Sequence, residues 1–524
     1  MKLTKLVCPI NLSREGQTTM SRKLMFVTAY GNAFIMIALT TYFFIIPFGI
    51  LASAINDPGL KNGETPRFLY RWHHQLSDKF EPWARERIDS ERATELNTNN
   101  ISGTEWPIFS AVFYLWTTEA LQDAWAEDPS LNTTMPKEYA RGAIESAAAI
   151  ISDPNHANWV KVHWGDDYLS QENLFYRMLL ISGLTSYQKL LGDEKYELLL
   201  IDQVESLSQE LDASPFGLLD DYPGQCYPID ILPAIAAIQR ADGVLGTDHS
   251  VFIARAIHGF EGTRLDAQTQ LPAYIANSKT GEGIGPARGV GISYMLIWTP
   301  ELWPETAQTW FERYETHFWQ EGLIVTGVRE FSKQSTYSEW LVDVDAGPVI
   351  NGYGTAASAF GVGAARANGR FDQAYPLSAE MLVAAWPLPN GTLLGARTLS
   401  NLSDAPYTGE AILLFNLTRQ PIFDNMISGK NALPPVVYLA LSLYLAVGLA
   451  GLSYAFRSVK RWQRQLSELT KPQPYFPFIG WILLILAGAI ALIYSHMMTG
   501  LVLLLAALFV TSGLQNKTFH SVHA

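Results

Sequence analysis

The residues best suited to chemistry lie in one loop, which reads L-D-D-Y-P-G-Q-C-Y-P-I-D over residues 219–230. It places three carboxylates, two tyrosines and a cysteine among prolines and a glycine, directly before an apolar run at 231–238. Carboxyl groups can transfer protons, and aromatic rings can stack on a ligand or stabilise a developing cation. We expect the loop to end at a helix start with Asp230 as its N-cap, and a plain helix-capping loop is the alternative.

Acid/base catalysis requires two carboxyl groups whose surroundings separate their pKa values. Asp221, between another aspartate and a tyrosine, and Asp345, before A-G-P, are the leading pair. Asp220 and Glu410 are further catalytic candidates. Each of these acids taken alone could also cap a helix or face solvent.

A second group of polar and aromatic residues in Gly- and Pro-containing loops could bind a substrate by stacking or hydrogen bonding. Its members are Tyr222, Tyr227, Trp164, Asp166, Tyr168, Arg288, Tyr353 and Tyr407. Arg288, within G-P-A-R-G, could clamp a carboxylate or phosphate, or it could neutralise a neighbouring acid.

Several other kinds of site are not indicated by the sequence. No H-E-x-x-H or C-x-x-C spacing is present, so we expect no metal and no cofactor. The G-E-G-I-G-P-A-R-G segment lacks the strand and the Lys-Ser/Thr of a phosphate loop, and the acidic middle of the chain disfavours nucleic acid. We therefore expect neither nucleotide nor nucleic-acid binding.

The elements that must position these residues are mostly helices, because apolar residues recur at three and four positions between residues 66 and 420. The clearest cases are 109–125, 173–191, 196–211, 231–239, 249–260, 290–298, 306–319, 356–367 and 377–385. Strand patterns are limited to 325–330 and 392–397. Helices rich in small residues alternate with bulkier ones, which favours a closed toroid of helical hairpins whose loops converge at one mouth. An open α-solenoid is the alternative.

Residues 164–250 resemble the linalool dehydratase/isomerase family. The similarity rests on Trp164-Gly165-Asp166, Q-E-N-L-F-Y-R at 171–177, L-G-D-E-K-Y at 191–196, A-S-P-F-G-L at 213–218 and L-G-T-D-H at 245–249, with weaker matches at 343–349, 357–360 and 407–415. The resemblance implies an (α/α)6 barrel related to terpenoid cyclases and six-hairpin glycosidases. The family's catalytic histidine and two cysteines are replaced here by Leu179, Asp220 and Ile229, and Cys226 is out of register.

Charge is unevenly distributed along the 524 residues, whose net charge is −13. Three stretches, 26–54, 433–456 and 475–514, contain no Asp, Glu, Lys or Arg, and a membrane span needs about 20 apolar residues. The third stretch is about twice that length and has a polar break at Ser495-His496, which suggests a helical hairpin. The sequence therefore predicts four transmembrane helices.

Two basic segments, 1–25 and 457–471, each contain five basic residues and one acid, so the positive-inside rule places them in the cytoplasm. We expect a multi-pass protein of the plasma or inner membrane with both termini cytoplasmic and its acidic middle exported. The predicted parts are a basic N-terminus (1–25), a first span (26–54), the exported barrel (55–432), a second span (433–456), a basic loop (457–474), a transmembrane hairpin (475–514) and a tail (515–524). A cleaved signal peptide is the alternative for the first span.

Three functions fit these patterns. The first is an exported, membrane-anchored enzyme that acts on a glycan or lipid-linked sugar by carboxylate acid/base catalysis. The second follows the resemblance and is a lyase or isomerase of a terpenoid or other amphiphilic alcohol. The third is a non-catalytic scaffold or binding module of the cell envelope, since a fold alone does not determine a function.

Overall fold

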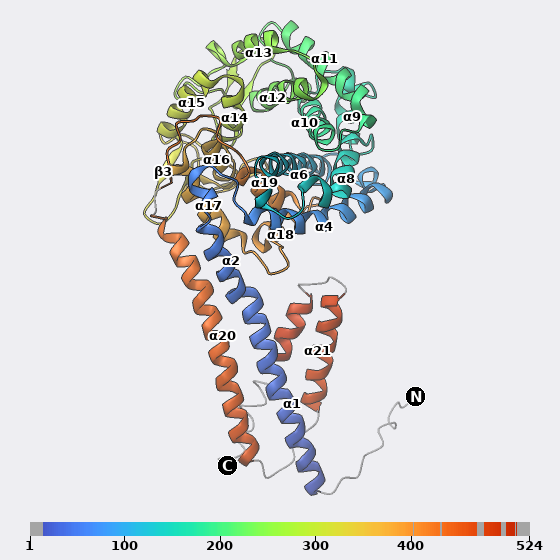
Figure 1. Cartoon of the computed structure of the whole chain (residues 1–524), viewed down its shortest axis with the longest axis vertical. Helices are drawn as coiled ribbons and strands as arrows, with labels where there is room; N and C mark the ends of the chain where they lie inside the picture. The colour runs from blue at the N-terminus through green and yellow to red at the C-terminus, as the bar shows by residue number, and fades with distance from the viewer. Residues whose placement is uncertain are drawn as a thin grey trace. The chain divides into compact units, whose positions relative to one another are not determined.

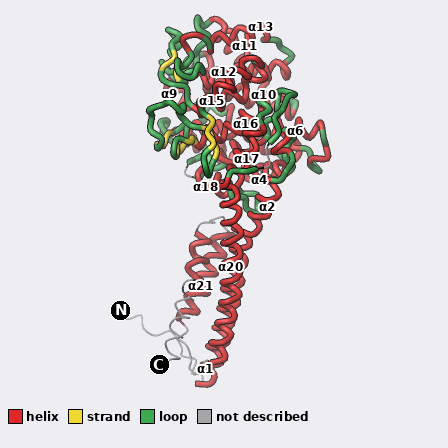
Figure 2. The backbone as a smooth tube through the Cα atoms, turned by 90° about the vertical axis from the view of Figure 1, so that its left-hand side faces the viewer, coloured by secondary structure: helices red, strands yellow, loops and turns green. Residues whose placement is uncertain are grey.

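The computed structural model describes residues 14–401, 403–429, 432–468, 476–493, 499–508 and 510. The chain is mainly helical, and its strands are few and short (Figure 2). It divides into two compact units, Gly49–Leu441, called the large domain below, and Met1–Phe48 together with Ser442–Ala524. The predicted cytoplasmic segments 1–25 and 457–474 and the hairpin 475–514 lie partly outside the described residues, and the tail 515–524 lies wholly outside them.

Six helices of the large domain contact one another in a closed cycle (Figure 1). In the order of the cycle they are α6 (Ile101–Glu127), α10 (Leu174–Leu191), α12 (Pro228–Leu245), α14 (Gly289–Leu302), α16 (Thr355–Ala367) and α19 (Thr408–Leu417), and α19 packs back against α6. They are called the inner helices below.

Small residues let the inner helices approach one another closely. A Cβ atom added at Gly363 of α16 would collide with Asn416 of α19 and Ile297 of α14, and one at Gly361 would meet Val328. Almost every residue of α14 is buried, which is typical of a helix enclosed on all sides.

The remaining long helices pack on the outside of this cycle. They are α4 (Phe68–Asp89), α8 (Arg141–Ser152), α11 (Glu197–Ala213), α15 (Pro304–His317) and α17 (Phe371–Ala385). Shorter helices complete the set: α3 (Gly59–Asn62), α5 (Arg92–Glu95), α7 (Pro136–Tyr139), α9 (Asn158–Trp164), α13 (Ser250–Ala256) and α18 (Leu394–Ser400), with single turns at Pro129–Leu131, Tyr168–Ser170, Glu194–Tyr196, Ile257–Phe260 and Gly262–Arg264.

The strands of the described chain form three small antiparallel sheets. They are β1 (Ile275–Ala276) with β2 (Gly283–Ile284), β3 (Trp319–Glu321) with β4 (Thr326–Val328), and β5 (Leu341–Asp343) with β6 (Gly347–Ile350) and β7 (Tyr353–Gly354). β1 and β2 lie in the connection that leads to α14, and the other strands lie in the connection that leads to α16.

Two local predictions were wrong. Residues 392–397 are not a strand, because α18 begins at Leu394 and the Arg397 N–H donates to the Leu393 carbonyl as in a helix. Asp230 is not an N-cap, because α12 already begins at Pro228, whose fixed φ suits the first helical position. Tyr227 is the N-cap, and Asp230 lies within the first turn.

Two helical stretches, Gly16–Asn62 and Pro435–Ser467, are long and apolar enough to cross a membrane. The first comprises α1 (Arg14–Thr40), a π-helical turn (Thr41–Ile45), α2 (Ile46–Ile55) and α3, and the second lies within α20 (Pro435–Glu468). The apolar segments within α21 (Phe476–Ile493) and at Thr499–Leu508 are shorter. In the smaller unit, α1 contacts α21, and the Trp481 indole N–H donates to Asn32 Oδ1 at 2.6 Å.

Candidate functional site

Four carboxyl groups lie close together where inner helices begin. Glu105 lies near the start of α6, Asp230 lies in the first turn of α12, Asp221 precedes α12, and Asp345 lies between β5 and β6. The charges of Asp345 and Glu105 raise the pKa of Asp230, and Asp230 raises that of Asp221. These four residues are called the acid cluster below.

Asp221 is the most enclosed member of the acid cluster, with 1% of its surface exposed. Its Oδ2 accepts the Tyr227 N–H at 2.7 Å, while Oδ1 makes no hydrogen bond of normal geometry. Burial, and then the charge of Asp230, raise the pKa of Asp221 well above its ordinary value. The raised pKa favours the protonated form of Asp221, which can donate a proton.

Glu105 and Asp230 were missed as site residues by the sequence analysis. The Tyr222 hydroxyl donates to Glu105 Oε1 at 2.5 Å. Burial raises the pKa of Glu105 to about 7, the hydrogen bond from Tyr222 opposes the rise, and the charge of Asp345 adds to it. Burial, followed by the charges of Asp345 and Glu105, raises the pKa of Asp230 as well. The signal available in the sequence for Glu105 was a single acid in the otherwise uncharged run from residue 101 to 118.

Asp345 is the exposed member of the acid cluster, and the Tyr274 hydroxyl donates to its Oδ2 at 2.7 Å. The guanidinium of Arg288 lies 4.5 Å from the centroid of the Tyr274 ring. Tyr274 and Tyr227 face each other edge to face with ring centroids 5.8 Å apart. Two tyrosines, Tyr222 and Tyr274, therefore each donate a hydroxyl to one carboxyl of the acid cluster.

Arg288 is engaged by carboxylates of the protein itself. Its Nε lies 2.6 Å from Glu330 Oε1 and its Nη2 lies 3.1 Å from Asp343 Oδ1. The Glu330 side chain is fully buried, and burial raises its pKa to about 7 although Arg288 lowers it. Of the two roles considered for Arg288, the contacts favour neutralising neighbouring acids over clamping a substrate.

Asp220 builds the loop that holds Asp221. Its Oδ2 accepts the Gly224 N–H at 2.7 Å, and its own N–H donates to Glu172 Oε2 at 2.6 Å. The Trp164 indole also supports this loop by donating to the Asp221 carbonyl at 3.2 Å. Cys226 is buried in the same loop, and burial together with the nearby aspartates raises its thiol pKa. A thiol in that state is a poor nucleophile.

The remaining candidates do not contact the acid cluster. Tyr168 is buried against Tyr176, and Asp166 is exposed after α9. Tyr353 packs on the β3–β4 hairpin, where its hydroxyl accepts a hydrogen bond from Gln320 at 3.1 Å. Their positions fit a structural or solvent-exposed role.

Tyr407 and Glu410 belong to a separate polar group. Glu410 forms an ion pair with Arg397 and accepts the Leu393 N–H at 2.9 Å. The Arg397 guanidinium lies 4.0 Å from the centroid of the Tyr407 ring. Glu410 is therefore bound by an internal cation, unlike Asp221.

An aromatic cluster on the inner helices adjoins the acid cluster. Phe109 lies one helical turn after Glu105, and its ring contacts Phe113 and Tyr294 at centroid distances of 4.4 and 6.3 Å. Burial, followed by the charge of Asp230, raises the pKa of Tyr294. The cluster continues through Phe360, Trp116, Trp298 and Phe415. It is called the aromatic floor below.

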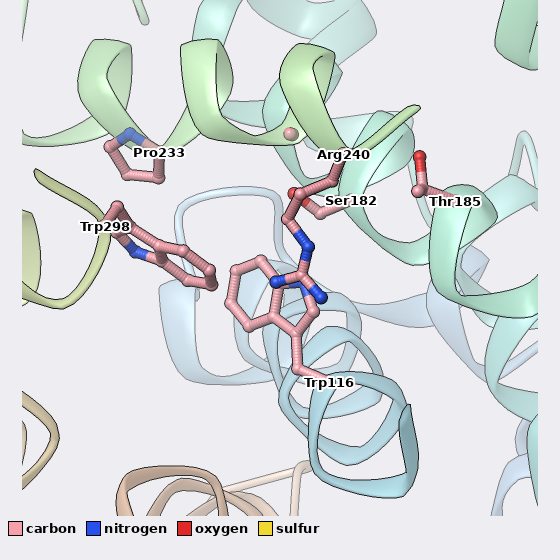
Figure 3. Close-up of a pocket in the computed structure, with 7 residues that line it drawn as sticks. Trp116, Ser182, Thr185, Pro233, Arg240 and Trp298 are labelled. Atoms are coloured by element: carbon pink, nitrogen blue, oxygen red, sulfur yellow. The ribbon is translucent and has the colours of Figure 1, made fainter. Parts of the chain in front are cut away.

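A small gap lies farther along the same inner helices (Figure 3). Arg240 extends toward Trp116 there, and the other lining residues are Ser182, Thr185, Pro233, Ala237 and Trp298. Arg240 also pairs with Glu119 at 2.5 Å. The gap has no room for a water molecule, so it cannot hold a substrate in this conformation.

Within the described residues, no group of three or more His, Cys, Asp or Glu side chains is arranged to hold a metal ion. In comparisons with known proteins, no family model matches the chain, and no curated protein matches it.

Proposed function

We propose that the chain is a membrane-anchored enzyme whose large domain is an exported (α/α)6 barrel, and that it acts on a glycan or a lipid-linked sugar. The observation that carries the proposal is the acid cluster, in which burial and mutual repulsion keep Glu105, Asp221 and Asp230 protonated more readily than ordinary carboxyls. The closed cycle of six inner helices supports the barrel.

In this proposal Asp221 donates a proton to the leaving oxygen of the substrate, and Asp345 acts on the opposite side as base or nucleophile. Tyr274 orients Asp345 through its 2.7 Å hydrogen bond. Tyr227 and Tyr222 supply ring faces and hydroxyls that suit a sugar. Retention or inversion would follow from the separation of the two catalytic carboxyls.

Membrane anchoring is supported by the two membrane-length stretches and by the basic residues that flank the uncharged segments. We propose four spans, the third and fourth within 475–514, with both termini in the cytoplasm. Tethering of this kind would keep the acid cluster near substrates that are themselves attached to lipid.

The test compares Asp221→Asn and Asp345→Asn with Asp166→Asn, an exposed-loop control, in the full-length protein in lipid nanodiscs. Each variant is assayed for hydrolysis of a panel of glycans and lipid-linked sugars, and its melting temperature confirms that it is folded. We expect losses of at least about 10²-fold for the two cluster variants and none for the control. Unchanged turnover in folded cluster variants would refute the proposal and favour a scaffold.

A second candidate, dehydration or isomerisation of an amphiphilic alcohol, is favoured by the aromatic floor. Rings such as Phe109, Tyr294 and Phe113 adjoin the acid cluster, where they could stabilise a carbocation after Asp221 protonates a hydroxyl. The resemblance to the linalool dehydratase/isomerase family fits the same reaction. Conversion of a terpenoid alcohol by the wild type, lost in Asp221→Asn, would select this candidate over the first.

A further inference from the structure

The tip of the β3–β4 hairpin is apolar and exposed. It reads G-L-I-V at residues 322–325, with Leu323 91% exposed and Ile324 50% exposed. Hairpin loops are normally built from Gly, Asn, Asp, Pro and Ser, so two large aliphatic side chains in water need an explanation. An exposed leucine and isoleucine at a hairpin tip indicate a surface that is covered by a lipid or by another apolar surface.

The structure also locates this tip relative to a membrane-length helix. The Val436 N–H in the first turn of α20 donates to the Ile324 carbonyl at 3.0 Å. This turn also begins the helical part of the uncharged segment 433–456. From Pro435 to Phe456 the helix is about 33 Å long, which matches the ~30 Å hydrocarbon layer. The first turn of α20 therefore lies at the level where such a segment enters a bilayer.

The residues around the contact are of the kind found at a membrane surface. Tyr438, one turn into α20, is 53% exposed, and aromatic side chains are enriched at the membrane–water interface. The loop 322–325 contains no charged residue, so nothing in it opposes entry into the apolar layer. Gly322 makes room for Tyr353, and its N–H donates to the Val325 carbonyl at 2.9 Å, which holds the loop closed.

We infer that Leu323 and Ile324 insert into the lipid bilayer beside α20, as a contact of the large domain with the membrane additional to the spans. The inference rests on the proposed membrane anchoring through α20. Because the insertion is apolar and uncharged, it does not depend on anionic lipid. The hairpin that carries the tip continues through β4 to Glu330, which pairs with Arg288 at the edge of the acid cluster. The segment from Leu323 to Glu330 thus connects the proposed membrane contact with the edge of the acid cluster.

The test is a depth measurement on the full chain in nanodiscs that contain one copy each. A single cysteine for an environment-sensitive fluorophore is introduced by Leu323→Cys in a Cys8→Ser background, since Cys226 is buried and unreactive. Leu198→Cys is the matched control. Leu198 is a leucine of α11 that is 83% exposed, and it is far in sequence from both membrane-length stretches. Leu443→Cys, in the uncharged part of α20, reports on anchoring itself.

We expect the label at 323 to lose fluorescence to a nitroxide-bearing lipid and to be shielded from iodide, equally in neutral and anionic nanodiscs, while the label at 198 behaves oppositely. Lipid quenching at 443 without lipid quenching at 323 would overturn the inference and leave anchoring intact. Absence of lipid quenching at 443 would refute anchoring, and the inference with it. Shielding at 323 from both quenchers would indicate that another protein surface covers the tip, which also overturns the inference.

Discussion

At the scale of single residues, the site differs from an ordinary acidic loop because no cation of the described residues lies close enough to Glu105, Asp221 or Asp230 to lower its pKa. Glu410 has Arg397, and Glu119 has Arg240 and Lys189, whereas Asp221 has backbone donors and two further carboxyls, Asp220 and Asp230, nearby. The sequence predicted Asp221 and Asp345 as catalytic candidates from their loops, and the structure places both in the acid cluster. It could not identify Glu105, because an acid within a helix becomes a site residue only when the fold encloses it.

The enclosure of Glu105 predicts a dependence of stability on pH. Its pKa is raised from 4.5 to about 7, so between these values the folded state binds the proton more tightly than the unfolded state. The contribution of Glu105 to stability is therefore fully present below about pH 4.5, falls as pH rises, and is lost above about pH 7. Between these pH values the contribution of Glu105 to the free energy of unfolding changes by at most about 3 kcal/mol. Solvent screening of the partly exposed carboxyl reduces this value.

Melting temperatures of full-length protein at pH 4.5, 6 and 7.5 measure this effect. Glu105→Gln should flatten the fall in stability between pH 4.5 and 7.5, whereas Glu86→Gln, an exposed control on α4, should leave it as in the wild type. Identical pH profiles for Glu105→Gln and wild type would show that Glu105 does not titrate in this range.

At the scale of elements, helical periodicity predicted five of the six inner helices, and α19 was not among the expected helices. The expected helices at 109–125, 173–191 and 356–367 fall within or almost within α6, α10 and α16. The three-stranded sheet β5–β6–β7 was missed because its strands are two to four residues long, too short for an alternating pattern to register. Residues 392–397 read T-L-L-G-A-R, which is too short to separate a strand from a helix by its pattern, and α18 contradicts the strand assignment.

The close approach of inner helices predicts that one glycine cannot be enlarged. Gly363→Ala places a methyl group against Asn416 and Ile297, so we expect destabilisation of about 1–3 kcal/mol. Gly243→Ala is the matched control, because Gly243 also lies in a helix but has open space around it. That change should stabilise the protein by roughly 0.5–1 kcal/mol. Denaturant or thermal unfolding of both variants measures the contrast, and equal effects would contradict close packing of α16 against α14 and α19 at Gly363.

At the scale of the whole molecule, one buried arginine binds the end of the first membrane-length stretch, and the residues directly after it, to the inner helices. Arg366 of α16 donates from Nη1 to the Gly59 carbonyl at 3.1 Å, from Nη2 to the Glu64 carbonyl at 3.0 Å, and from Nε to the Arg419 carbonyl at 2.8 Å. No sequence pattern could reveal this, because the partners are backbone carbonyls some 300 residues away for two of the three bonds.

Replacing this arginine should loosen the fastening even when the charge is kept. Arg366→Lys retains the cation but cannot reach three carbonyls from one planar fork, so we expect a loss on the order of 3 kcal/mol. Arg313→Lys is the control, because Arg313 is more exposed and its Nη1 bonds the Gln270 carbonyl. Limited proteolysis at residues 56–67 and melting curves report the effect. Equal protection of both variants would show that the three hydrogen bonds do not hold the segment.

Two of these three hydrogen bonds can form only late in synthesis, because their partners are far apart in the chain. The segment around Gly59 emerges from the ribosome long before α16, and its partner in the ring is 307 residues away in the chain. The contact that closes the cycle, between α6 and α19, also spans about 300 residues. Contacts between such distant parts form slowly, and they leave early helices unpartnered while the rest of the chain is made. The apolar faces of the first inner helices therefore stay uncovered until α19 has been synthesised. We expect a nascent chain of this protein to need chaperones most during this interval.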